Sequence, residues 1–155
     1  MARDAKKGND FLSYSMPYDN RLHPESETLN PPYAVVNCYQ DVAPCRHRVG
    51  FSFLTGTVAM IFRNIYSYAY GIRPCLEGLT IDPCLEKSML PAEITYSYRG
   101  KKLRITYMES EETRGTICGA KLDYTTDVLT GRSVMRIREE QIKENTSINI
   151  MVGVK

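Results

Sequence analysis

The chain has 155 residues, a formal net charge of +2, 43% hydrophobic residues and 25% charged residues. This length suits one globular domain of ordinary size with its own core, and the nearly balanced charge argues against a general polyanion-binding protein. The sequence has no apolar run of the roughly 20 residues that cross a membrane and no signal-peptide core at its start, so we expect a cytoplasmic protein.

The five cysteines form no Cys-x-x-Cys pair. An odd count without that spacing is typical of neither a disulfide scaffold nor a zinc ribbon, so we expect reduced thiols. Cys38, Cys45 and His47 match no common ligand spacing, and we therefore expect no metal site.

Residues 1–32 are polar and rich in turn formers, including Pro24 and the run Asn30-Pro31-Pro32. This composition predicts an irregular arm without a core of its own. Residues 33–39 are a short apolar run that fits either a buried strand or a helical turn, and residues 40–50 are typical of a loop.

The segment from Phe51 to Gly71 predicts a helix that begins near Thr55 and stops at Gly71. Its apolar residues recur at three-and-four spacing, at Val58, Ile61, Phe62, Ile65, Tyr66 and Ala69. A helix start offers free N–H groups and the positive end of the helix dipole, and Gly56 lets a phosphate oxygen approach the backbone. Two interpretations stay open: a phosphate site, or an ordinary N-cap threonine on a core helix.

After Gly71 the pattern changes to short strands with turns between them, which predicts an antiparallel sheet or sandwich. Residues 94–98 and 103–107 alternate apolar and polar side chains around Arg99-Gly100-Lys101 and predict a hairpin. One face of this hairpin carries Ile94, Tyr96 and Tyr98. Further strands are expected near residues 116–119, 133–138 and 147–154.

The predicted helix carries aromatic residues on several sides, at Phe62, Tyr66, Tyr68 and Tyr70. The preceding loops have too little apolar surface to cover it, and the β lobe can cover only part of it. We therefore infer a fragment of a larger protein or a subunit that docks on one.

Three blocks in order resemble the C-terminal end of the inverting glycoside phosphorylases of glycoside hydrolase family 94. This family includes cellobiose, chitobiose and β-1,2-oligoglucan phosphorylases. Pro32–Asn37 resembles its Pro-Tyr-Val segment, and Gly50–Thr57 resembles its aromatic-x-Thr-Gly-Ser/Thr turn. Tyr70–Leu85 is similar to its Leu-Gly-Ile-Arg-Pro segment and the Leu-x-Ile-Asp-Pro-Cys strand that follows. The resemblance covers about residues 30–107.

The resemblance implies an α+β chain, with the last helix of an (α/α)6 barrel followed by a C-terminal antiparallel β-sandwich lobe. Residues 1–32 would then be an irregular arm. Residues 33–72 would form the end of the helical barrel with its phosphate-binding turn, and residues 73–155 would form the C-terminal lobe.

The implied activity is that of a glycosyltransferase: a phosphorylase that cleaves β-glucosidic bonds with inorganic phosphate and releases an inverted sugar 1-phosphate. An aspartic acid protonates the glycosidic oxygen, and phosphate attacks the anomeric carbon from the opposite face. Phosphate is already a nucleophile, so no general base is required. The chain has no segment that matches the family's general acid, so we assign it no catalytic residue.

By the same resemblance, the phosphate ligands are the Thr55 hydroxyl, the N–H groups of Gly56 and Thr57, and Asn37. Cellobiose-type members have glutamine at the position of Asn37, and here Gln40 follows three residues later. This difference suggests the β-1,2-glucan branch as one alternative. Tyr39, near the expected phosphate site, is either a core or rim tyrosine or a stacking surface for a sugar ring.

No cofactor is implied, since inorganic phosphate is a substrate. The expected partners are a β-glucan or disaccharide substrate, phosphate and a missing barrel domain or subunit, with a homodimer as a further expectation; nucleic acid and membrane are not expected. Arg73 is expected to bind carbonyl groups and tie the helix end to the β lobe, and Asp82 to form an Asx turn before Pro83. His23 and His47 are expected in exposed loops.

Two alternatives belong to other functional classes. The first is a carbohydrate-binding β-sandwich module, which needs a row of exposed aromatic side chains such as Tyr96, Tyr98, Tyr107 and Tyr124. The absence of tryptophan weighs against it. The second is a non-catalytic docking subunit that completes a separately encoded barrel, which the exposed helix face would favour.

Overall fold

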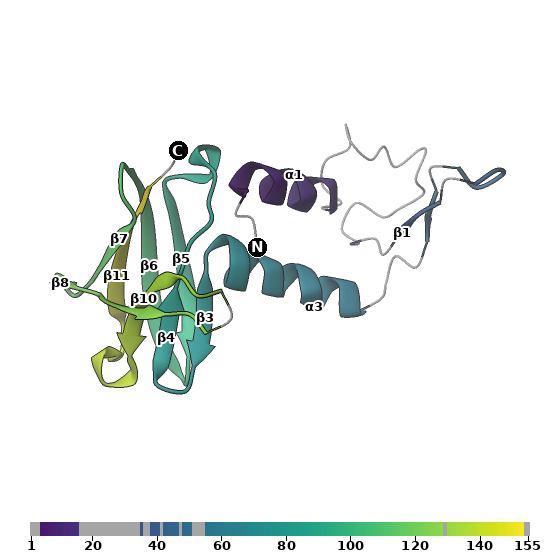
Figure 1. Cartoon of the computed structure of the whole chain (residues 1–155). Helices are drawn as coiled ribbons and strands as arrows, with labels where there is room; N and C mark the ends of the chain where they lie inside the picture. The colour runs from purple at the N-terminus through teal and green to yellow at the C-terminus, as the bar shows by residue number, and fades with distance from the viewer. Residues whose placement is uncertain are drawn as a thin grey trace. The chain divides into compact units, whose positions relative to one another are not determined.

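The computed structural model describes residues 4–15, 35, 38–40, 42–46, 48–50, 55–128 and 130–153. The chain divides into two compact units, one of Lys6–Ile65 and one of Tyr66–Lys155 together with the first five residues. Figure 1 shows the course of the chain through both units.

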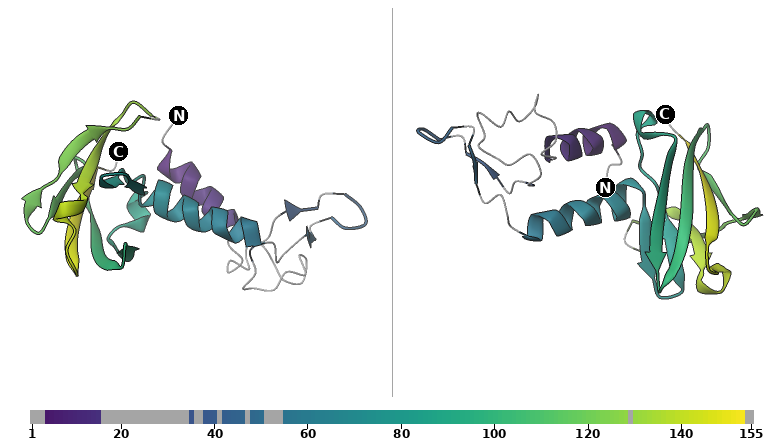
Figure 2. Two further views of the ribbon diagram at one scale, coloured as in Figure 1. Left: turned by 90° about the horizontal axis from the view of Figure 1, so that it is seen from below. Right: turned by 180° about the vertical axis from the view of Figure 1, so that it is seen from behind.

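The first unit holds most of helix α1 (Ala5–Ser15), the short strands β1 (Cys38–Tyr39) and β2 (Val49–Gly50), and helix α3 (Thr55–Asn64). Strands β1 and β2 pair antiparallel, with Cys38 opposite Gly50. Helix α1 lies beside α3 in every view (Figures 1 and 2).

Helix α1 lies inside the segment 1–32, which we expected to be irregular. Asp4 immediately precedes it, and aspartate is a preferred residue type at a helix N-cap. Gly8 and Asn9 are poor helix formers, and because of them the sequence of this segment did not predict a helix. Residues 16–32 lie outside the described residues.

Helix α3 begins at Thr55, as predicted. It continues as a π-helix over Ile65–Ala69, and the backbone turns at Gly71, where φ is +73°. The predicted buried face is only partly buried, because Ile61 is 8% exposed whereas Val58 is 38% and Phe62 57% exposed. The described residues therefore leave much of the helix's apolar surface uncovered.

The second unit contains two sheets and is a β-sandwich, which confirms the predicted lobe. The four-stranded sheet has the order β3 (Ile72–Cys75), β4 (Gly78–Ile81), β10 (Ser133–Arg138), β9 (Asp123–Thr126). The five-stranded sheet has the order β5 (Ala92–Tyr98), β6 (Lys101–Ser110), β11 (Thr146–Gly153), β7 (Arg114–Ile117), β8 (Ala120–Lys121). Single 3₁₀ turns occur at Lys87–Met89 and Glu139–Gln141. Figure 1 shows the two sheets as separate layers.

The core of this unit lies between the two sheets, where alternate residues of each strand point inward. The four-stranded sheet contributes Leu79, Ile81 and Ile137, and the five-stranded sheet contributes Leu103, Ile105, Ile148 and Ile150, all fully buried. The predicted hairpin is confirmed as β5 and β6, with Ile94 opposite Ile105 and Tyr96 opposite Leu103. The other three predicted strands correspond to β7, β10 and β11.

The five-stranded sheet is mixed, whereas we predicted an antiparallel one. Strand β11 runs parallel to β6, with pairing from Thr146–Leu103 to Gly153–Ser110. A parallel pair needs a long connection, and here the chain passes through β7–β10 before it returns. The alternation of side chains indicates which face is buried but not the direction of a strand, so the sequence pattern did not reveal this pair. The described residues contain no (α/α)6 barrel, and the place of α3 in one stays a prediction.

Candidate functional site

The first turn of α3 is the predicted phosphate site, and the structure describes its backbone from Thr55 onward. The first N–H groups of an α-helix have no carbonyl partner one turn earlier in the helix. Gly56 is exposed, and a Cβ atom built on it would meet nothing within 4 Å. The turn contains no acidic residue that would repel an anion. An anion can therefore approach the positive end of the helix dipole at Gly56.

The strand pair β1–β2 connects this turn to the Pro32–Asn37 block. Asn37 directly precedes Cys38, whose partner Gly50 stands five residues before Thr55 in the chain. The backbone N–H of Gln40 donates a hydrogen bond of 2.9 Å to the carbonyl oxygen of Arg48, which extends the ladder. Two blocks that carry the resemblance thus enter the same small unit from paired strands.

The structure describes the backbone of three of the four predicted phosphate ligands. The backbone of Thr55, Gly56 and Thr57 forms the start of α3. The side chain of Thr55 and all of Asn37 lie outside the described residues, as do His23 and His47. The structure therefore tests the helix start but leaves the ligand set a prediction.

The longest block, Tyr70–Leu85, contains the hairpin β3–β4, and backbone hydrogen bonds tie the residues after this hairpin to the end of the helix. The Asp82 N–H donates to the carbonyl oxygen of Gly71 at 3.0 Å, and the Cys84 N–H donates to that of Ala69 at 2.8 Å. A Cβ on Gly71 would lie 2.2 Å from the carbonyl carbon and oxygen of Asp82. Gly71 is thus required both by its positive φ and by this close approach. The block therefore serves the fold of the lobe.

Arg73 binds carboxylates, whereas we predicted that it would bind carbonyl groups. Its Nη1 atom lies 2.7 Å from Oδ2 of Asp127, and its Nη2 atom lies 3.7 Å from Oδ2 of Asp82. The pair with Asp127 is largely shielded, with side chains 22% and 9% exposed. Arg73 therefore ties β3 to the loop that follows β9. The sequence analysis missed Asp127, because nothing in the pattern links residues so far apart.

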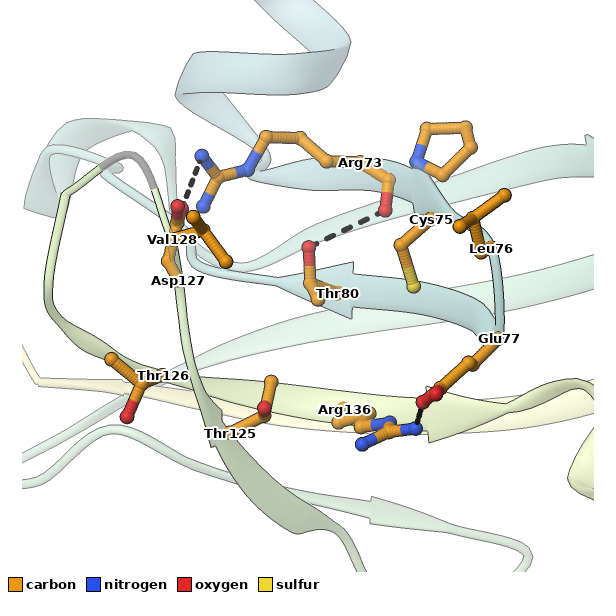
Figure 3. Close-up of a pocket in the computed structure, with 11 residues that line it drawn as sticks. Arg73, Cys75, Leu76, Glu77, Thr80, Thr125, Thr126, Asp127, Val128 and Arg136 are labelled. Atoms are coloured by element: carbon orange, nitrogen blue, oxygen red, sulfur yellow. Dashed lines mark hydrogen bonds and ion pairs between the residues drawn. The ribbon is translucent and has the colours of Figure 1, made fainter.

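A shallow groove of about 550 Å³ lies on the four-stranded sheet around Arg73. Figure 3 shows its floor, where Arg73, Thr80 and Arg136 come from adjacent strands. Arg136 is paired with Glu77, and Leu76 and Val128 at the rim are 96% and 97% exposed. Both arginines of the groove are thus engaged with carboxylates, and no aromatic side chain lines it. It lacks the stacking surface and the free cation that would identify a sugar or phosphate site.

The tyrosines proposed for a carbohydrate-binding module do not form an exposed row. Tyr107 is 0% and Tyr98 is 6% exposed, both in the core. Tyr96 is half-buried and packs on Tyr66, with ring centroids 6.0 Å apart. Of these four side chains Tyr124 alone is largely exposed, at 54%. A stacking platform for sugar rings built from this set is therefore ruled out.

The described cysteines are all free thiols: Cys38, Cys45, Cys75, Cys84 and Cys118. Among the described residues, His, Cys, Asp and Glu side chains form no group able to hold a metal ion. In the same part of the chain, no helix is long and apolar enough to cross a membrane.

The chain is similar to the solabiose phosphorylase of Paenibacillus borealis, with 29% identity over 123 residues. The similarity covers 76% of this chain and 15% of that enzyme, so the chain spans a small part of the length of the relative it matches. No known family profile matches the chain. The similarity to a phosphorylase supports the relationship that the three blocks predict.

Proposed function

We propose that this chain is the C-terminal portion of a glycoside phosphorylase and that it contributes part of the phosphate site. The substrate would be a β-glucoside, with a β-1,2-glucan as the narrower alternative, and the product an inverted sugar 1-phosphate. The similarity to the solabiose phosphorylase carries this proposal, together with the start of α3 at Thr55 and the open space at Gly56. The five free cysteines fit a cytoplasmic location for such an enzyme.

In the proposed site the first turn of α3 holds the attacking phosphate. The N–H groups of Gly56 and Thr57 and the hydroxyl of Thr55 would donate hydrogen bonds to its oxygens, with Asn37 as a fourth donor. The helix dipole adds roughly 0.3–1 kcal/mol of favourable interaction with an anion, and charge-assisted hydrogen bonds add more. Phosphate needs no base to become a nucleophile, so the task of this chain is to bind it and orient it.

The general acid and the sugar-binding loops would belong to another part of the protein or to a partner chain. The exposed apolar residues of α3 and of the π-helix that continues it support this: Met60 is 66%, Val58 38% and Tyr68 48% exposed. A helical barrel packed against α3 would remove this surface from water. The same surface also fits the alternative of a non-catalytic docking subunit.

A complementation assay tests the proposal. The Paenibacillus borealis enzyme without the segment that matches this chain is combined with this chain, and formation of a sugar 1-phosphate is measured. We expect activity only when both are present, and a loss of at least about tenfold with Thr55→Ala, since one lost donor to a reacting anion costs that much or more. The matched control Thr126→Ala, on an exposed strand position, should leave activity unchanged. Binding of the two chains without activity would favour the docking subunit.

A further inference from the structure

The outer face of the five-stranded sheet carries an excess of positive charge. On this face the side chains that alternate with the core residues of each strand point to solvent, and Figure 1 shows the strands in one layer. We call it the basic face, because its charged side chains are the carboxylate of Glu93 and four cations: Lys102, Arg104, Arg114 and Lys121. Four cations and one carboxylate give this face a net charge of +3, whereas the whole chain carries +2.

The cations of the basic face differ from the arginines of the other sheet in their partners. Arg73 and Arg136 of the four-stranded sheet each pair with a carboxylate. On the basic face, Nε of Arg104 lies 3.5 Å from Oε1 of Glu93, and the two side chains are 69% and 56% exposed. The other three cations are exposed and have no carboxylate partner among the described residues. Their charge therefore remains available to an incoming anionic group.

Uncharged polar side chains fill the centre of the basic face. Thr106 of β6 lies opposite Asn149 of β11, which in turn lies opposite Thr116 of β7. Neighbouring strands are about 4.8 Å apart, so these three side chains form a row about 10 Å long. Beside the row, Met108 of β6 lies opposite Met151 of β11. Hydroxyl and amide groups can bond to the main chain of a protein partner, and methionine adapts to an irregular surface.

The basic face lacks the stacking surface of a nucleic-acid site. The structure describes all five strands, and their aromatic residues Tyr96, Tyr98 and Tyr107 pack on the core side. Proteins that bind single-stranded nucleic acids stack bases on exposed aromatic side chains, and those that bind duplexes carry a larger excess of positive charge. Carboxylates of a protein segment need no stacking, since they pair with lysine and arginine through charge-assisted hydrogen bonds.

We infer that the basic face is a docking site for an acidic segment of another protein. Carboxylates of that segment pair with the four cations, and its main chain lies along the row of Thr106, Asn149 and Thr116. Exposed ion pairs are individually weak and are screened by salt, so the contact needs several carboxylates and is strongest at low ionic strength. Glu111 and Glu112, exposed in the turn between β6 and β7, repel such a segment and limit the site at that end.

Titration of the isotope-labelled full chain with an octapeptide of alternating glutamate and serine tests this inference, with amide chemical shifts as the readout. We expect saturable changes at Thr106, Asn149 and Thr116, and binding at least about tenfold weaker when salt rises from about 50 mM to about 500 mM. A matched octapeptide of glutamine and serine should give no saturable changes. Lys121→Glu should weaken binding about threefold or more. Arg132→Glu, an equal charge change at an exposed position before β10 of the other sheet, should leave it unchanged.

Reversal of all four charges gives a result that a misfolded chain would not. The variant with Lys102→Glu, Arg104→Glu, Arg114→Glu and Lys121→Glu should lose the glutamate peptide and bind an octapeptide of alternating lysine and serine on the same strands. No saturable changes with the glutamate peptide, equal changes with the glutamine peptide, or equal weakening by Lys121→Glu and Arg132→Glu would overturn the inference. Tighter binding of a uridine octanucleotide on these strands would overturn it in favour of a nucleic-acid site.

Discussion

The hydroxyl group of Tyr107 donates a hydrogen bond of 3.0 Å to the carbonyl oxygen of Tyr70, and the centroids of the two rings lie 5.3 Å apart. Tyr107 is fully buried in β6, and Tyr70 follows the π-helix that extends α3. This contact joins the end of the helix to the core of the sandwich.

Replacement of Tyr107 by phenylalanine should lower the free energy of unfolding by about 1–2 kcal/mol, because the variant loses a buried hydrogen bond and keeps the ring. Tyr98→Phe is the matched control. Its hydroxyl is buried and has no hydrogen-bond partner among the described residues, so its removal should be neutral or stabilising. Urea unfolding of both variants measures the difference. Equal losses would contradict the assigned role of the Tyr107 hydroxyl.

Stability should fall in alkaline solution, in part through Tyr107. Burial, and then the charge of Tyr70, raises the pKa of Tyr107 well above its ordinary value of 10.0. Below about pH 10 both states keep the proton, and stability does not change. Above it the unfolded state ionises first, so stability falls by up to about 1.4 kcal/mol per pH unit. Unfolding midpoints from about pH 9 to 11 should fall less steeply for Tyr107→Phe. If the unfolding midpoints of the wild type and of Tyr107→Phe fell equally with pH, Tyr107 would not contribute to the alkaline loss of stability.

Gly71→Ala should destabilise the lobe by about 3 kcal/mol or more. The substitution adds a strained positive φ to a collision with the Asp82 backbone at 2.2 Å. Gly100 has a similar φ of +80°, but a Cβ there would meet nothing within 4 Å. Gly100→Ala should therefore cost only the strain, about 1 kcal/mol. Chemical denaturation distinguishes the two variants, and equal losses of stability would contradict the role assigned to the close approach of Gly71 and Asp82.

The ion pair of Arg73 with Asp127 should stabilise the fold more than that of Lys87 with Glu109, although both have N–O distances of 2.7 Å. The first pair is 22% and 9% exposed, the second 72% and 46%. Double-mutant cycles should give coupling energies of about 1–3 kcal/mol for the first and below about 0.5 kcal/mol for the second. Added salt should weaken only the exposed pair appreciably. A coupling near zero for Arg73 would contradict its role as a tie.

Local patterns predicted the local elements. The three-and-four spacing and the Thr-Gly start placed α3 at Thr55, and the alternation around Arg99 indicated the β5–β6 hairpin. Contacts between residues far apart in the sequence were not predicted. The parallel pairing of β11 with β6 and the contact of Arg73 with Asp127 depend on where the chain returns in space. Helix α1 was missed because its signal is an N-cap residue type followed by poor helix formers.

The proposed function requires that the first turn of α3 bind phosphate. Amide chemical shifts of the isotope-labelled chain during titration with inorganic phosphate, with chloride at equal ionic strength as the reference, test it most directly. We expect saturable chemical-shift changes at the amides of Gly56 and Thr57, which Thr55→Ala weakens and Thr126→Ala leaves unchanged. Unchanged amides at these two residues, or equal shifts with chloride, would contradict it.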